Sequence, residues 1–299
     1  IDPVPIKTCN WNCVYCQLGR TRPLRTERRY NFPNLEILAQ VRDALDGHGP
    51  GEIDWVTFVG SGETTLHAGL GDMIRSVKRM TDLPVAVITN GSLLYMPDVR
   101  EELSAADAVL PSLDAGNAVL YRRINRPHPS LTFERLMEGL IAFRKMYTGK
   151  LWVEVMLVRG LNDTEQALQE IASCLAQIQP DEVQLVQPTR PPAEAWVKPP
   201  DAEGLARAET ILGDVGRIIL PATGSFDFSG DEDLVKAIDG IITRHPMRET
   251  ELVETLEYWS PGEVRETLQS LADSGRAQVV VREGVRFWST SDAYYDPGV

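Results

Sequence analysis

The stretch KTCNWNCVYCQLGR (residues 7–20) holds three of the four cysteines of the chain, Cys9, Cys13 and Cys16, in a C-x3-C-x2-C spacing. Three thiols this close together can converge on one centre only if the chain curls around it as a loop. Thiolates are soft ligands that suit iron–sulfur clusters or zinc. Structural zinc normally takes four protein ligands, and the fourth cysteine, Cys174, lies far away in a helical pattern. The spacing therefore indicates a four-iron cluster whose fourth iron is open to a small molecule.

Length and composition describe an ordinary globular protein with one large and one small domain. The 299 residues are 43% hydrophobic and 24% charged. No apolar run approaches the roughly 18–20 residues of a membrane span, and no secretory signal is visible. Four cysteines, three of them clustered, do not make a disulfide framework. We therefore expect a cytoplasmic protein without membrane contact, and its net charge of −13 argues against a general polyanion binder.

Residues 1–225 alternate short apolar runs with amphipathic segments. The predicted strands are residues 4–8, 55–60, 84–89, 108–113, 151–158 and 182–187. The predicted helices are residues 35–45, 70–80, 99–105, 133–147, 164–178 and 202–212. This alternation is typical of βαβ units around a parallel sheet, and six units are too few for a closed eight-fold barrel. We expect an α/β fold with an open, partial (β/α)6 barrel of the TIM type, and chemistry at the C-terminal ends of its strands.

The pattern changes after a predicted linker at residues 224–233. The following segments predict three helices, at residues 234–244, 249–256 and 261–274, and a hairpin of strands at residues 277–282 and 285–289. This order is typical of a small winged-helix domain, which we assign to residues 226–299. Residues 231–299 carry 14 acidic and 7 basic side chains, so a module that contacts protein or covers substrate is favoured over one that binds nucleic acid.

The cysteine motif, with Tyr15 before its last cysteine, resembles the signature of radical S-adenosylmethionine (SAM) enzymes. The resemblance implies that Cys9, Cys13 and Cys16 hold a [4Fe–4S] cluster and that the amino and carboxylate groups of SAM bind its fourth iron. An electron, supplied by a donor such as flavodoxin or ferredoxin, would cleave SAM to a 5′-deoxyadenosyl radical. That radical would abstract hydrogen from the substrate.

The turn Gly60-Ser61-Gly62-Glu63-Thr64 is similar to the Gly-Gly-Glu motif of the same family. Glycines let a backbone approach a ligand closely, and the resemblance implies that Glu63 binds the methionine ammonium. It also implies ribose contacts at two strand-end residues and adenine near Tyr15. The complete predicted SAM-binding set is Tyr15, Gly60, Gly62, Glu63, Thr64, Asn90, Ser112, Asp114, Glu154 and Gln187. The alternative is that these positions are tight turns and strand-end caps.

Arginines are concentrated directly after the cysteines and after the fourth predicted strand. Arg20, Arg25, Arg28 and Arg122 are placed to line the mouth of the barrel, where guanidinium groups suit phosphates and carboxylates. They predict an anionic substrate. The equal alternative is a solvated face paired with the abundant acidic residues.

Two longer stretches, CNWNCVYCQLGRT and INRPHPSLTFERLMEGL (residues 124–140), resemble the radical SAM group related to wyosine tRNA-base synthases. The function we expect is a radical SAM enzyme acting on an unidentified, small or anionic substrate. The first alternative is a radical SAM enzyme that modifies a tRNA base. The second is a redox-sensing iron–sulfur regulator that binds DNA, which would need neither the glycine-rich turn nor the polar strand ends.

Overall fold

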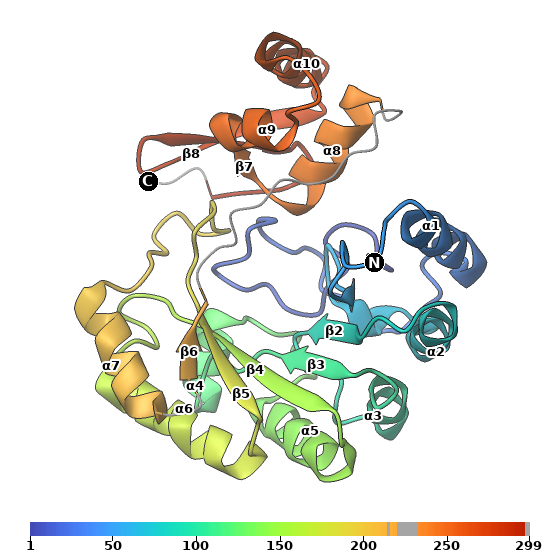
Figure 1. The fold of residues 1–299 in the computed structure, drawn as a ribbon. Helices are drawn as coiled ribbons and strands as arrows, with labels where there is room; N and C mark the ends of the chain where they lie inside the picture. Colours follow the sequence, from blue (N-terminus) through green and yellow to red (C-terminus); the bar gives the residue numbers. More distant parts are fainter. Residues whose placement is uncertain (214–215, 220–232, 297–299) are drawn as a thin grey trace.

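The N-terminal part of the chain is built on a six-stranded parallel sheet (Figure 1). The structure, a computed structural model, describes residues 1–213, 216–219 and 233–296. The strands are β1 (Val56–Phe58), β2 (Val85–Thr89), β3 (Ala108–Pro111), β4 (Lys150–Met156), β5 (Glu182–Val186) and β6 (Gly216–Ile218). They follow each other in the sheet in sequence order, and every neighbouring pair is parallel. The predicted α/β fold with a partial barrel is confirmed.

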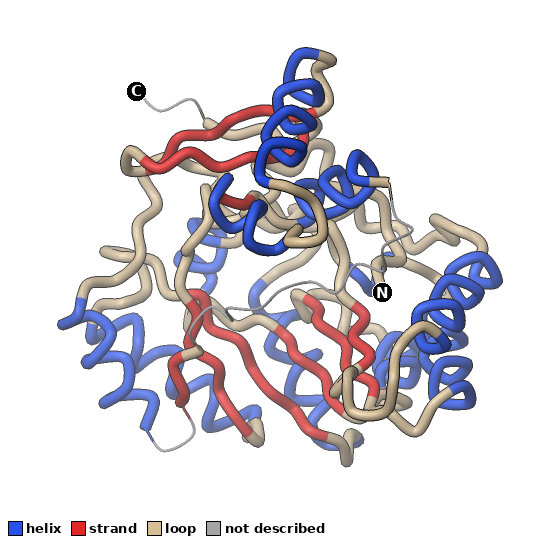
Figure 2. The backbone as a smooth tube through the Cα atoms, turned by 45° about the horizontal axis from the view of Figure 1, so that its top comes forward, coloured by secondary structure: helices blue, strands red, loops and turns tan. Residues whose placement is uncertain are grey.

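Helices join successive strands and cover the outer side of the sheet (Figures 1 and 2). They are α1 (Asn34–Asp46), α2 (Leu70–Met80), α3 (Pro97–Leu103), α4 (Ala118–Ile124), α5 (Phe133–Met146), α6 (Glu165–Ile178) and α7 (Ala202–Leu212), with a short 3₁₀ helix η1 (Thr64–Leu66). Side-chain caps fix where several begin: Asn117, Thr132 and Thr164 each accept a hydrogen bond from the first turn of α4, α5 and α6. No helix of the described residues is both long enough and apolar enough to cross a membrane.

One strand prediction was wrong, and one strand was missed. Residues 4–8 form a loop, because Lys7 has a left-handed φ of 63° that no strand continues through. The sixth strand of the sheet is instead β6, a three-residue segment too short to show a period. Helix α4 was also missed, since its seven residues span only about two turns.

The C-terminal module consists of α8 (Leu234–Arg244), β7 (Met247–Arg248), α9 (Glu249–Thr255), α10 (Pro261–Asp273), β8 (Ala277–Arg282) and β9 (Val285–Thr290). Its sheet is antiparallel with the order β7-β9-β8, and its core includes Ile238, Leu268 and Trp288. The three helices and the hairpin lie where they were predicted, and the assignment as a winged helix stays a prediction. The predicted linker at 224–233 and the boundary at 225 fall outside the described residues, apart from Asp233, which caps α8.

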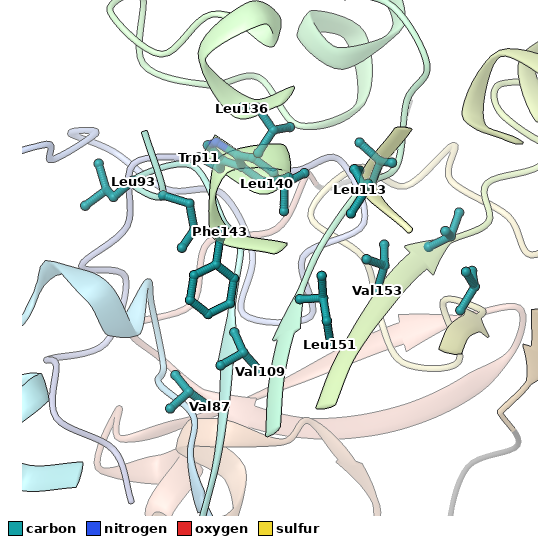
Figure 3. Close-up of a cluster of buried hydrophobic side chains, with 14 of the residues drawn as sticks. Trp11, Val87, Leu93, Val109, Leu113, Leu136, Leu140, Phe143, Leu151 and Val153 are labelled. Carbon is teal, nitrogen blue, oxygen red and sulfur yellow. The ribbon is translucent and has the colours of Figure 1, made fainter. Parts of the chain in front are cut away.

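The module lies on the side of the sheet opposite the covering helices, with the cysteine-bearing segment between them (Figures 1 and 2). Trp11, within the cysteine segment, packs into the main hydrophobic core and is 1% exposed. Figure 3 shows Trp11 in this cluster with Leu136, Leu140 and Phe143. Its ring also meets that of Tyr121 edge to face at 5.3 Å. Burial of this large side chain holds the cysteine loop in position against the core.

Candidate functional site

A cavity of about 360 Å³ lies between the cysteine loop, the C-terminal ends of the strands and the end of α8. Because parallel strands end at one edge of a sheet, it collects side chains that are far apart in sequence. It brings together nine predicted residues, Cys9, Cys13, Tyr15, Cys16, Gly60, Gly62, Ser112, Glu154 and Gln187. The cavity is therefore the candidate site.

The cysteine loop is held by the segment after α4. The N–H of Val14 donates to the carbonyl of Ile124 at 2.9 Å, the N–H of Asn12 to that of Asn125 at 3.0 Å, and the N–H of His128 to that of Asn10 at 2.8 Å. The stretch beginning INRP thus forms a backbone brace for the cysteines. The two stretches that carried the closer resemblance lie side by side here.

Each cysteine sulfur has an N–H donor beside it. The backbone N–H of Trp11 lies 3.5 Å from Cys9 Sγ, Asn125 Nδ2 lies 3.7 Å from Cys13 Sγ, and Lys7 Nζ lies 3.5 Å from Cys16 Sγ. These donors stabilise negative charge on sulfur. Burial nevertheless raises the pKa of Cys9 to about 12, and raises that of Cys13 as well. A bound cationic centre would compensate the thiolate charge that burial disfavours at Cys9 and Cys13.

The donor set fits an iron–sulfur cluster better than a single metal ion. Among the described residues, no group of three or more His, Cys, Asp or Glu side chains is arranged to hold one ion. A single zinc ion draws its thiolates to about 2.3 Å from one atom. A cluster binds each thiolate to a different iron and tolerates wider spacing. Cys9, Cys13 and Cys16 all line the cavity, each with an N–H donor near its sulfur, and they would suit an iron–sulfur cluster.

The glycine-rich turn packs backbone to backbone against the residues before Cys9. The N–H of Lys7 donates to the carbonyl of Ser61 at 2.7 Å, and the N–H of Glu63 donates to that of Thr8 at 2.8 Å. A Cβ on Gly62 would lie 2.0 Å from the carbonyl oxygen of Thr8. Glycine is required here by this close approach, which joins the turn to the cysteine loop.

Gly62→Ala is therefore expected to push the turn away from the cysteine loop. We expect a loss of about 1–3 kcal/mol in the free energy of unfolding, measured with urea, and less iron retained after reconstitution. Gly240→Ala in α8 is the control, because there the nearest atom to a new Cβ is the end of the Arg244 side chain at 3.7 Å. That variant should be as stable as the parent or slightly more stable. Equal stability of the Gly62 variant would contradict the close approach.

Glu63 lies beside the cavity but does not line it. Its side chain is buried, and its Oε1 accepts from the N–H and hydroxyl of Thr65 and from the hydroxyl of Thr89, at 2.5–2.9 Å. Its Oε2 accepts from the N–H of Asn90 at 2.7 Å. Four protein donors already satisfy this carboxylate. Because two of them belong to Thr89 and Asn90, the carboxylate connects the turn to the end of β2. Its predicted contact with the SAM ammonium stays a prediction.

Asn90 and Thr64, two other predicted SAM residues, also lie outside the cavity lining. The side chain of Asn90 donates to Asn10 at 2.7 Å and points toward Cys9 Sγ at 3.9 Å. Thr64 is buried in η1. In this structure Asn90 supports the surroundings of Cys9.

Asp114, which the resemblance predicts to contact the ribose together with Ser112, is buried and bonded to Tyr15. Its Oδ2 accepts from the Tyr15 hydroxyl and from Asn125 Nδ2, both at 2.6 Å, and its Oδ1 accepts from the N–H of Met156 at 2.8 Å. Burial raises the pKa of Asp114 despite these donors. Ser112 and Asp114 both follow the end of β3 at Pro111, and the predicted ribose contact of Asp114 stays a prediction. Asp114 positions the cysteine loop, whereas Ser112 lines the cavity.

Glu154, on β4, is the carboxyl that faces the cavity. No side chain of the described residues donates a hydrogen bond or forms an ion pair with it. Burial, followed by the nearby Asp114, raises its pKa to about 7. The group therefore titrates near neutral pH and can take up or release a proton there.

The raised pKa predicts a pH-dependent stability. Between 4.5, its ordinary value, and about 7, the folded protein binds more proton at Glu154 than the unfolded chain. Its contribution to stability is therefore lost as the pH rises through this range. In cofactor-free protein, Glu154→Gln should raise the melting temperature relative to the parent at pH 8 and have little effect at pH 5. Glu138→Gln, on an exposed part of α5, controls for the loss of one charge, and an equal gain in that variant would contradict the assignment.

The four arginines predicted to bind substrate do not line the cavity. Arg20 forms two 2.8 Å hydrogen bonds with Glu194 and also pairs with Asp296. Arg28 pairs with Glu102 and donates to the carbonyl of Thr65. Arg25 and Arg122 are exposed. The alternative interpretation, ion pairing with acidic residues, holds for Arg20 and Arg28.

Other basic residues line the cavity in their place, and the sequence analysis missed them. They are Lys7, Arg190, Arg244 and His245. Arg190 lies shortly after β5, so its position past a strand end was the available signal. Arg244 and His245 come from the end of α8, and no local pattern links them to the cysteines.

The sequence and the fold resemble those of known proteins. The sequence model of the family described as "Radical SAM superfamily" matches residues 4–172. UPF0026 protein MJ1312 of Methanocaldococcus jannaschii is 34% identical over 260 residues, which are 86% of this chain and 81% of that protein. The crystal structure of a radical SAM methyltransferase from Sphaerobacter thermophilus covers 71% of this chain and 63% of its own, with a TM-score of 0.51 and 20% identity. That likeness concerns the fold.

A longer relative carries a different name. A Brachyspira hyodysenteriae protein named "GTPase Obg" is 35% identical over 292 residues, 95% of this chain. The chain spans only 42% of that relative's length. The present sequence contains no Gly-x4-Gly-Lys-Ser/Thr phosphate-binding loop.

Proposed function

Because the chain belongs to the radical SAM superfamily, we propose that it abstracts a hydrogen atom from a small, anionic substrate held in the cavity beside Cys9, Cys13 and Cys16. The family is one of enzymes that use a [4Fe–4S] cluster and SAM. The observation that supports the proposal most directly is that all three cysteines and the polar strand ends line one cavity.

The three cysteines would hold the cluster, and the cavity would hold SAM and substrate. When bound, the cluster supplies the electron that cleaves SAM to methionine and a 5′-deoxyadenosyl radical, with flavodoxin or ferredoxin proposed as the donor. The residues of this chain do the positioning. Trp11, Asn125 and Lys7 donate toward the sulfurs, and Asp114 holds the Tyr15 hydroxyl at the wall. Ser112 and Gln187 present polar groups to the cavity for a nucleoside.

A small substrate is favoured over a nucleic acid. The cavity of about 360 Å³ has the size of a small-molecule site, and Arg244 and His245 of the C-terminal module line it. The net charge of −13 would also repel a polyanion. Both features favour a small-molecule substrate over a tRNA base.

The test is anaerobic reconstitution with iron and sulfide, followed by dithionite and SAM. We expect the protein to form 5′-deoxyadenosine and methionine even without its substrate, as slow uncoupled turnover. A fully reconstituted protein that binds SAM and forms neither product would overturn the proposal. The regulator alternative predicts a different result. The protein would then shift the electrophoretic mobility of DNA at physiological salt, and the shift would depend on the redox state of the cluster.

A further inference from the structure

The cavity is positively charged on the side where the barrel meets the C-terminal module. Lys7, Arg190 and Arg244 line it there. Of the described residues, no carboxylate lies within ion-pair distance of Lys7 or Arg190. Arg244 is 3.6 Å from Asp2, whose carboxylate also accepts from the N–H and hydroxyl of Ser61. This side therefore carries an excess of positive charge.

Arg190 is held so that part of its guanidinium group stays free. Its Nη1 donates to Gln17 Oε1 at 3.3 Å and to His245 Nδ1 at 2.8 Å. Its Nε and Nη2 make no hydrogen bond with any described residue. A guanidinium carries five N–H donors in a planar fork that matches phosphate and carboxylate oxygens. The unused donors of Arg190 are thus available to a ligand in the cavity.

His245 orients Arg190 without cancelling its charge. Burial, followed by Arg190 and Arg244, lowers the pKa of His245 to about 4, so the ring is neutral at pH 7 and its Nδ1 accepts. The acid with the main electrostatic effect on Arg190 is Glu251, which is itself paired with Arg248. Burial lowers the pKa of Arg190, which shows that its charge lacks full solvation. A half-buried cation of this kind gains most from an anionic partner.

The module and the barrel share this site. Gln17 directly follows Cys16 in the cysteine loop, Arg190 follows β5, and His245 ends α8. The C-terminal tail fixes the same loop, because the Tyr295 hydroxyl donates to the carbonyl of Gln17 and the N–H of Arg20 donates to that of Tyr294, both at 2.6 Å. The C-terminal module therefore contributes residues that line the site and also holds the cysteine loop in place.

We propose that Arg190, held by Gln17 and His245 and assisted by Arg244, binds an anionic oxygen group of the substrate, a phosphate or a carboxylate. This assignment rests on the proposed function and adds to it the chemical class of the substrate and the residues that recognise it. It also gives the C-terminal module a role in substrate recognition.

The test measures anion binding to the reconstituted, SAM-saturated 299-residue chain by calorimetry, with inorganic phosphate and malonate as probes at constant ionic strength. We expect one of the two to bind the parent, and the better probe identifies the group as phosphate or carboxylate. Arg190→Gln should weaken that binding at least tenfold. Arg190→Lys keeps the charge but loses the planar guanidinium, so its affinity should lie between those of the parent and Arg190→Gln. Arg25→Gln, an exposed arginine outside the cavity, should bind like the parent.

The outcomes separate this proposal from the proposed function. If neither probe binds the parent, or if the Arg190 and Arg25 variants bind alike, the anion site is wrong. If binding occurs only without SAM, Arg190 belongs to the carboxylate of SAM and the substrate assignment is wrong. Formation of 5′-deoxyadenosine by the same parent sample tests the radical SAM activity independently. Equal melting temperatures of parent and Arg190→Lys would show that weaker binding does not come from unfolding.

Discussion

Cys13→Ala is expected to leave the reconstituted protein without its iron–sulfur absorbance, with almost no bound iron and with no formation of 5′-deoxyadenosine. The reason is that Cys13 is one of only three thiols that line the cavity. Each thiolate of a [4Fe–4S] cluster binds a separate iron, so losing one exposes a second iron. The fourth cysteine cannot replace it, because Cys174 is buried in α6 with its Sγ 3.6 Å from the carbonyl of Gly116. Iron content per chain and the visible spectrum are the measurements.

Cys174→Ala is the matched control, since it removes a thiol of the same chain away from the cavity. It should keep the full iron content and the uncoupled formation of 5′-deoxyadenosine, at a modest cost in stability from the small void in α6. A Cys13→Ala protein that retains full iron would overturn the cluster assignment. The same holds if the Cys174 variant loses as much iron as the Cys13 variant.

The architecture was predictable where periodicity runs over whole elements. Helices α2, α7 and α8 have the predicted bounds, because long amphipathic segments between apolar runs leave few alternatives. Predictions failed for short elements. Residues 4–8 (VPIKT) suggested a strand. Lys7, however, has a positive φ, and its N–H donates to the Ser61 carbonyl, which lies more than 50 residues further along the chain. Such a contact leaves no periodic signal.

The sequence predicted which residues lie at the site better than it predicted what each residue does there. The cysteines and the polar strand ends meet because parallel strands end at one edge. The roles of the carboxylates depend on which donors the fold brings to them. Asp114 meets Tyr15 and Asn125, and Arg20 meets Glu194, 174 positions away. Charge pairing across such separations decides whether an arginine faces a ligand or an acid, and a single sequence does not encode it locally.

Two buried carboxylates therefore act on the cysteine loop through its neighbours. Asp114 binds Asn125, whose amide lies 3.7 Å from Cys13 Sγ, and Glu63 binds Asn90, whose amide lies 3.9 Å from Cys9 Sγ. In each case an asparagine links a buried acid to a sulfur. This parallel suggests that part of the predicted SAM-binding set holds the cysteine loop in place before any ligand arrives.

Glu63→Ala tests this role most severely and should lower the free energy of unfolding of the cofactor-free protein by about 3 kcal/mol or more. The substitution leaves the buried N–H and hydroxyl of Thr65 and the hydroxyl of Thr89 without an acceptor, at about 1–3 kcal/mol for each unsatisfied group. The free energy of unfolding of Glu63→Gln should lie between those of the parent and Glu63→Ala, because the glutamine amide keeps one acceptor oxygen. Urea unfolding without iron or SAM is the measurement, and Glu36→Ala on an exposed part of α1 is the control.

The choice of cofactor-free protein separates the two roles of Glu63. If the carboxylate serves the hydrogen-bond network, stability falls before any ligand is added, and iron retention falls with it because Asn90 loses its anchor beside Cys9. If it serves chiefly as an acceptor for the SAM ammonium, the cofactor-free variant should unfold like the parent and lose only affinity for SAM. The four donors around a carboxylate that is 1% exposed favour the first result, because an ammonium ligand would have to displace bonds that the folded protein already makes.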